Sequence, residues 1–271
     1  MRILLTFILL VTTNMLYGQV TIQNVDFTQK GEKIYISYDL QGQGKYWLSL
    51  YYSMNNGASW EGPVESIRED LSEVRPGTGK QITWNVLEDR DWLIAENLKI
   101  KIKEQPNEGT FTDSRDGQTY KWIRIGDQVW MVENLNYDAG HGCWCYDDNS
   151  RNCDQYGHLY NWETAKRVCP DGWHLPSKSE FETLLDRYGG KGEQAYNALK
   201  RGGSSGISVL LGGSRGSNGR FYYLGARGSF WSSSGYTSKC AWYLRIRSSS
   251  KVATMYYRDE SAGRSVRCLQ D

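Results

Sequence analysis

The chain has 271 residues, of which 39% are hydrophobic and 23% are charged, and its 32 Lys and Arg are balanced by 31 Asp and Glu. Its 11 Trp and 19 Tyr exclude a disordered chain, and its 29 Gly exclude a long coiled coil. At about 100 to 200 residues per domain, this length predicts one large domain or two modest ones. The near-zero net charge by itself indicates neither a nucleic acid nor a membrane surface as partner.

The first 18 residues have the features of a secretory signal peptide. Arg2 is followed by an apolar run from residue 3 to 11, which extends weakly to residue 16, and a small residue precedes the expected cleavage. A membrane anchor is the alternative, but the run is shorter than the roughly 20 apolar residues that span a bilayer. We therefore expect a secreted or outer-surface protein that starts at Gln19 and has no membrane span in the mature chain.

Residues 19–104 alternate between apolar and polar side chains, which is typical of half-buried strands. The clearest runs are 34–40 and 98–102, and further strands are expected at 46–53 and 81–86, with turn signals between them. Short strands at this spacing predict an all-β, immunoglobulin-like sandwich. The segment has no His or Cys, so we expect a structural or spacer role. The polar stretch that follows predicts a linker at 105–112.

Residues 113–271 are expected to form a second domain with both helices and strands. Ser177 and Glu180 form a capping box before apolar residues at positions 181, 184, 185 and 188, and Gly189 ends this helix. A shorter helix is expected at 160–168. Beyond Arg201 the helical period is lost, and strands are expected at 241–247 and 252–258, joined by Ser-rich loops.

Several motifs of this second domain occur in the order of a known family. They are DGQTY at 116–120, IGDQVWMVENLN at 125–136, YGHLYNW at 156–162, CPDGWHLP at 169–176, WSSS at 231–234 and SVRC at 265–268. This series resembles the Fibrobacter succinogenes major paralogous domain, which occurs in secreted and surface proteins. The resemblance covers roughly residues 113–271 and implies a C-type-lectin-like fold. It implies no activity, because the family is largely uncharacterised.

The lectin-like fold is also that of the formylglycine-generating enzymes, which makes catalysis an alternative to weigh. Those enzymes hold copper with two closely spaced cysteines late in the chain, whereas Cys240 and Cys268 are 28 residues apart here. The three histidines, His141, His158 and His174, have no nucleophile motif beside them. We expect no enzymatic activity and no cofactor, and keep a modifying enzyme only as a distant alternative.

All six cysteines lie in the second domain, and in an exported protein disulfides are their expected state. The resemblance implies a pair between Cys169 and Cys268, because lectin-like folds tie their first helix to their last strand. A local clip between Cys145 and Cys153 is the second expected pair. The two remaining cysteines, Cys143 and Cys240, make the third.

Two metal sites are alternatives in the same loop region. His141 and Cys143, with Cys145 and Cys153, are zinc-type ligands, but Cys-x-Cys is tighter than the usual zinc spacing, so disulfides are favoured. An acidic group suits calcium, but the sugar-binding tripeptides of calcium-dependent lectins are absent, and a solvated loop is favoured. We therefore expect no metal. The acidic group comprises Asp138, Asp147, Asp148 and Asp154.

The last 71 residues have a composition of their own. Residues 201–271 hold 11 basic and 3 acidic residues, a net charge of +8, which leaves −8 for residues 19–200. The same stretch contains ten aromatic residues, 11 Gly and 15 Ser, a composition shared with antibody paratopes. Core positions are the alternative for the aromatic residues, and we favour this for Trp231 and Trp242. The alternative to a binding role for the basic charge is that the −8 remainder of the chain neutralises the +8 segment internally.

We therefore predict a non-enzymatic binding or adhesion protein that recognises an extracellular protein or glycan without calcium. An acidic or sugar-like ligand is favoured over nucleic acid, because the protein is exported and the rest of the chain is acidic. A structural subunit of a surface assembly is the alternative, and the oligomeric state stays open. In relatives that are diversified by retroelements, the stretch between the WSSS and SVRC motifs carries the variable positions. The resemblance therefore allows a diversified variable protein as one form of this prediction. The predicted ligand-binding residues are Tyr236, Lys239, Tyr243, Arg245, Arg247, Tyr257, Arg258 and Asp259.

Overall fold

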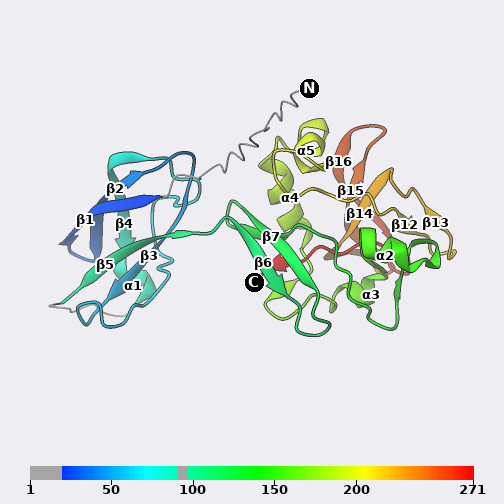
Figure 1. Cartoon of the computed structure of the whole chain (residues 1–271), viewed down its shortest axis with the longest axis horizontal. Coiled ribbons are helices and arrows are strands. Elements are labelled where there is room, and N and C mark those ends of the chain that lie inside the picture. Colours follow the sequence, from blue (N-terminus) through cyan, green and yellow to red (C-terminus); the bar gives the residue numbers. More distant parts are fainter. Residues whose placement is uncertain (1–19, 91–96) are drawn as a thin grey trace, which may run out of the picture. The chain divides into compact units, whose positions relative to one another are not determined.

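The computed structural model describes residues 20–90 and 97–271. The predicted signal peptide lies outside these residues. The chain forms two compact units, residues 1–105 and 106–271, and both are rich in β-strands (Figure 1). Among the described residues, no helix combines the length and apolar character that crossing a membrane requires.

The first unit consists of two small antiparallel sheets. One has the order β1-β2-β4, and the other pairs β3 with β5. A single short helix follows β4 within the described part of this unit. The elements are β1 (Thr21–Lys30), β2 (Lys33–Gln41), β3 (Trp47–Ser53), β4 (Gly77–Asn85), α1 (Val86–Asp89) and β5 (Lys99–Gln105).

The two sheets of the first unit share one hydrophobic core. Ile34 and Ile36 of β2 face Leu50 of β3 in this core, together with Trp84 of β4 and Ile102 of β5. The alternating pattern therefore predicted which side chains are buried, and the four expected strands are confirmed. The strand expected at 81–86 ends one residue early, because Val86 already begins α1.

The second unit is built on a five-stranded sheet of order β11-β17-β8-β7-β6 and a three-stranded antiparallel sheet of order β14-β15-β16. Two short strand pairs, β9 with β10 and β12 with β13, complete it. Its strands are β6 (Glu108–Thr112), β7 (Thr119–Ile125), β8 (Gln128–Met131), β9 (Cys143–Trp144), β10 (Leu159–Tyr160), β11 (Trp173–His174), β12 (Ser214–Arg215), β13 (Phe221–Tyr222), β14 (Arg227–Thr237), β15 (Cys240–Arg247), β16 (Val252–Asp259) and β17 (Leu269–Gln270). Its α-helices are α2 (Ser150–Tyr156), α3 (Trp162–Ala165), α4 (Lys178–Asp186) and α5 (Glu193–Leu199).

Helices α4 and α5 cover one face of the three-stranded sheet. The predicted capping box starts α4: the Ser177 hydroxyl accepts from the Glu180 N–H, and the Glu180 carboxylate accepts from the Ser177 N–H. The apolar side of α4, with Phe181 and Leu184, packs in one core with Leu244 and other residues of β15 and β16. Because alternate strand residues point to opposite faces, the neighbours of Leu244 in β15, Tyr243 and Arg245, lie on the other face, away from α4 and α5.

Two other expectations differ from the structure, and two of its helices were not expected. The helix expected at 160–168 is limited to α3, because Tyr160 pairs in β10 and the Asn161 side chain caps the helix behind it. The second half of the expected linker forms β6, where the ring of Phe111 stacks on Trp173 with a centroid distance of 4.2 Å. Helices α2 and α5, which are short, had no clear helical pattern.

Two of the three expected disulfides are confirmed, and the third is wrong. Cys169 is bonded to Cys268, and Cys145 to Cys153, but Cys143 and Cys240 are both unpaired. Cys143 lies in β9, next to β10, whereas Cys240 opens β15 in a different sheet. The strand pairing thus holds the last two cysteines in separate places, a constraint that counting cysteines does not reveal.

The two disulfides are expected to contribute unequally to stability. Cys169 and Cys268 are 99 residues apart and Cys145 and Cys153 only 8. On the loop-entropy account, losing the long bridge costs about 4 to 5 kcal/mol and losing the short one about 2 to 3 kcal/mol. Urea unfolding of the double Cys-to-Ala variants would measure both losses. Equal losses, or a larger loss for the short bridge, would contradict this account.

Candidate ligand-binding site

The free face of the three-stranded sheet borders a cavity of about 350 Å³. The β12–β13 hairpin and the turn before Arg264 close its other sides. Its lining is strongly basic and aromatic, with only one carboxylate. The charged members are Arg215, Arg227, Arg245, Arg258, Arg264 and Asp259, and the aromatic members are Tyr222, Tyr223, Tyr243 and Tyr256.

The register of β15 and β16 places several of these side chains on one face. Tyr243 lies opposite Tyr256, and Arg258 lies opposite the small Ala241. Directly opposed residues of an antiparallel pair share a face, so the tyrosines and arginines of the two strands face the same cavity. The guanidinium of Arg245 lies over the ring of Tyr256, 4.2 Å from its centroid, which orders both side chains.

A close backbone approach positions the hairpin that closes the cavity. Arg215 of β12 pairs with Gly263 through two backbone hydrogen bonds of 2.8 and 2.9 Å. A Cβ atom on Gly263 would lie 2.9 Å from the Cβ of Arg215 and 3.2 Å from the Trp144 ring. Glycine at 263 is therefore what lets β12 approach the buried chain beside Arg264.

Arg264 has an environment that is unusual for a buried charge. The residue is only 4% exposed, and its Nε is buried without a hydrogen-bond partner. Its guanidinium lies between two rings, 3.7 Å from the centroid of Tyr243 and 4.9 Å from that of Trp231. Burial lowers the pKa of Arg264 to about 10; Tyr243 opposes this shift, and the like charges of Arg258 and Arg245 add to it. The group is therefore still charged at neutral pH.

Arg267, three residues later, shows how a buried arginine is normally accommodated. It is 2% exposed, and its Nε donates to the Asn134 side-chain oxygen at 2.9 Å. Its terminal nitrogens donate to the carbonyls of Ile207 and Ser208. Arg267 thus joins its own segment to Asn134 and to residues 207–208. Arg264, in contrast, packs against two rings, and its Nε–H donor has no acceptor.

Two further cations of the cavity also stack on rings. Arg227 lies 3.4 Å from the centroid of Tyr223, and Arg215 lies 4.2 Å from that of Trp144. Asp259 accepts hydrogen bonds from the backbone and hydroxyl of Ser261. In the described part of the chain, none of the five arginines forms an ion pair with a carboxylate. The cavity therefore carries an excess of positive charge.

The structure brings half of the predicted binding residues into this cavity and leaves the other four outside its lining. Tyr243, Arg245, Arg258 and Asp259 line it. Tyr236 and Tyr257 are not part of the lining, and their rings stack on each other with a centroid distance of 4.0 Å. Arg247 lies at the far end of β15, and Lys239 lies in the turn between β14 and β15.

The cavity also contains residues that the sequence analysis did not select. Tyr256 continues the alternation of its strand and was detectable by that signal. Arg264 has no local signal, because its neighbours form the SVRC motif. Arg215, Arg227, Tyr222 and Tyr223 lie outside the two expected strands.

The two tryptophans expected in the core differ. Trp231 is fully buried, as expected, and its Nε1–H donates to the carbonyl oxygen of Tyr160 at 2.7 Å. Trp242 is only partly buried and packs edge-on against Tyr236 and Tyr257. Trp242 alternates with Tyr243 in β15 and therefore lies on the face that α4 covers, where the amine of Lys178 is 5.1 Å from its ring centroid.

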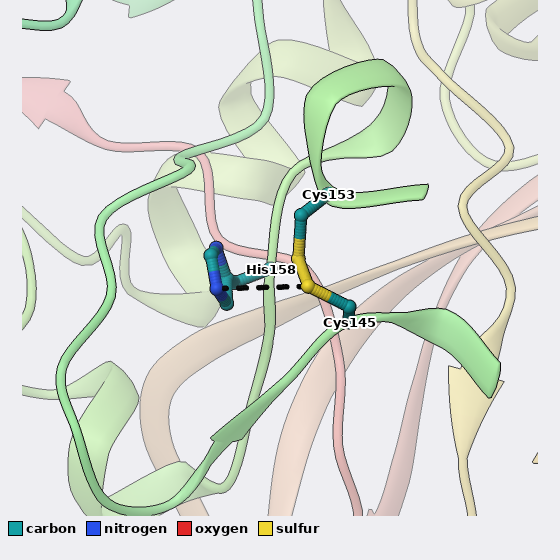
Figure 2. A group of neighbouring side chains, drawn as sticks. All are labelled: Cys145, Cys153 and His158. Atoms are coloured by element: carbon teal, nitrogen blue, oxygen red, sulfur yellow. Dashed lines mark hydrogen bonds between the residues drawn. A yellow bond between two sulfur atoms is a disulfide. The ribbon is translucent and has the colours of Figure 1, made fainter. Parts of the chain in front are cut away.

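The loop with zinc-type ligands is organised by a disulfide (Figure 2). Cys145 and Cys153 bond to each other, so neither sulfur is available as a thiolate ligand. The ring of His158 lies beside this bond, with Nε2 3.9 Å from the sulfur of Cys145, and its Nδ1 is 2.8 Å from the Asn136 side-chain oxygen. A Zn²⁺ site that uses both of these sulfurs is therefore ruled out while the bridge is intact.

One further group of ligand-type side chains lies next to it. Atoms of Asp138, Cys143 and His158 lie within 4.8 Å of one another. The Cys143 thiol donates to the Asp138 carboxylate at 3.3 Å, and burial together with this carboxylate raises the pKa of the thiol. Within the described residues, the four aspartates considered for calcium form no such group.

The fold and the cavity define a disulfide-linked, β-rich module with a basic, aromatic cavity on one face of a sheet. Residues 123–270 match the model of the Fibrobacter succinogenes major domain, which is more than half of the chain. The chain therefore belongs to this family. Searches of curated proteins and of solved structures gave no significant match.

His158 is expected to make stability depend on pH. Burial lowers the pKa of His158 below its ordinary value of 6.5. In acid the unfolded chain binds this proton more readily than the folded chain, so the free energy of unfolding falls as pH drops below 6.5. His158→Gln should flatten the decline between pH 6.5 and about 5, measured by urea unfolding. The exposed His141→Gln is the control, and an unchanged decline in His158→Gln would refute this role.

The two buried arginines are expected to respond differently to replacement by methionine, which preserves much of the packing. Arg267→Met leaves the Asn134 oxygen and two carbonyls without donors, so we expect a loss of about 3 kcal/mol in unfolding free energy. Arg264→Met removes a charge that has no counter-ion, so its cost should be under about 1 kcal/mol. Chemical denaturation compares the two. A similar loss in both would show that Arg264 is needed for the fold.

Proposed function

We propose that this protein is an extracellular, non-enzymatic binding protein. In this proposal an immunoglobulin-like domain carries a C-type-lectin-like domain, and the free face of β14, β15 and β16 binds a protein or glycan ligand. The observation that carries the proposal is the cavity on this face, which combines exposed tyrosines with arginines that have no carboxylate partners.

The sulfur chemistry supports export of the chain. Two disulfides join residues of the second unit, and disulfides persist mainly in oxidising, extracellular compartments. The basic and apolar start of the sequence is consistent with the same destination.

The arrangement of elements supports the two proposed folds. In the first unit, two antiparallel sheets enclose one core, as in immunoglobulin-like sandwiches. In the second unit, Cys169 is bridged to Cys268 just before the last strand, β17. This long-range tie is the one that the resemblance to lectin-like folds implied.

Binding is favoured over catalysis by the composition of the cavity. Its tyrosines provide contact area, its Ser, Gly and Asn residues provide adaptable hydrogen bonding, and its arginines provide anchoring charge. A calcium-dependent mode is not favoured, because the aspartates considered for it do not gather around a common point in the described residues. The proposed mode of binding therefore depends on side chains alone.

The proposal predicts a ligand among extracellular proteins or glycans, detected by incubating residues 19–271 on arrays of both. Binding should persist in EDTA. Tyr256→Ala should weaken it about tenfold, because this tyrosine is 40% exposed on the proposed face. Tyr35→Ala, at an equally accessible tyrosine of the first unit, is the control and should change little. Absence of any ligand, or loss of binding in EDTA, would contradict the proposal.

A further inference from the structure

We propose that the cavity binds an acidic glycan, with a carboxylate or sulfate group held by the arginines around Arg264 and a sugar ring beside the tyrosines. This inference rests on the proposed binding function and names the class of ligand. It is carried by the buried Nε of Arg264, which has no hydrogen-bond partner, by the excess of cations over carboxylates, and by the exposed rings at the rim.

The charge of the cavity calls for an anion. Five arginines and one aspartate line it, which gives a net charge of +4. A buried charge without a partner is costly, and two further arginines, Arg245 and Arg258, act on Arg264 with charge of the same sign. A bound oxyanion would supply the missing acceptor, and guanidinium groups bind such oxygens with paired hydrogen bonds.

The acidic part of the chain does not neutralise this site. Residues 19–200 carry a net charge of −8, which is enough in number to balance the basic segment. Four of the five cavity arginines nevertheless stack on rings, and none of the five pairs with a carboxylate in the described residues. Asp259, the single carboxylate in the lining, is engaged with Ser261. The positive field therefore remains available to a ligand.

The rest of the lining favours a sugar as the carrier of the anion. Tyr223 and Tyr256 are 48% and 40% exposed; an arginine lies over one face of each ring, and the remaining ring surface is what a sugar would pack on. Ser214, Ser217 and Asn218 of the β12–β13 hairpin offer hydrogen-bonding groups suited to hydroxyls. The volume of about 350 Å³ is at the small end of ligand pockets, which suits one charged sugar unit of a longer chain.

The experiment measures binding of residues 19–271 to four polymers by biolayer interferometry. Polygalacturonate supplies carboxylates, dextran sulfate supplies sulfates, dextran is the uncharged sugar, and poly-glutamate is an acidic peptide. We expect binding to one or both acidic polysaccharides, weaker binding to poly-glutamate and none to dextran. Comparison of the first two polymers identifies the anionic group. Binding should weaken when salt rises from about 0.05 to about 0.5 M, because exposed charges are screened.

Matched variants separate the cavity from general charge. Arg245→Gln with Arg258→Gln should weaken binding at least tenfold. Arg151→Gln with Arg167→Gln removes the same charge at exposed positions outside the cavity and should change binding less than twofold. Arg264→Met should also weaken binding at least tenfold, and its circular dichroism spectrum shows whether it folds. If Arg264→Met does not fold, the double variants still decide.

Three results would overturn the inference. Equal losses in the two double variants would show non-specific attraction. Preferred binding to poly-glutamate would assign the cavity to an acidic peptide. Array binding to a neutral ligand that requires Tyr256 but not Arg245 and Arg258 would refute the acidic glycan while leaving the proposed function standing. A chain that binds nothing on the arrays and none of the four polymers would refute both.

Discussion

The second unit depends on a buried segment near the end of the chain. Residues 262–269 are all buried, and their backbone bonds to four different parts of the unit. Arg264 pairs with Tyr160, and Ser265 bonds to both Ser229 and Trp231. The Val266 carbonyl accepts from the N–H of Leu135. Cys268 forms the disulfide with Cys169, 99 residues earlier in the chain. The peptide groups of this segment cannot reach water, so the surrounding elements must supply their partners.

The same segment holds two buried arginines with opposite environments within a few residues. Arg267 points to a polar site made by two other segments, and its hydrogen bonds are satisfied there. Arg264 lies between Tyr243 and Trp231 at the inner wall of the cavity, where its Nε has no partner. A protein tolerates such a group where it serves a function, because the cost is offset elsewhere in the fold. Helices α4 and α5 pack on the opposite face of the sheet, so they do not cover this wall.

Elements that depend on contacts between nearby residues were predictable from the sequence, and elements that depend on contacts between distant segments were not. The strands of the first unit and helix α4 were predicted well, because alternation and a capping box are local signals. Helix α5 and strand β6 were missed, because short elements owe their form to the surfaces they pack against. In the cavity, Tyr243, Arg245, Arg258 and Asp259 were selected by composition, whereas Arg215 was brought in only by its pairing with Gly263.

The sequence by itself determined the family, the β-rich character, the concentration of basic and aromatic residues after residue 200, and two of the disulfides. These follow from composition, ordered motifs and local periodicity. The tertiary structure decided which cysteines stay unpaired, which of two nearby arginines is satisfied, and which basic residues share one cavity. The physical reason is that strand register and the docking of the β12–β13 hairpin are set by contacts between segments far apart in sequence. One sequence read along its length does not record those contacts.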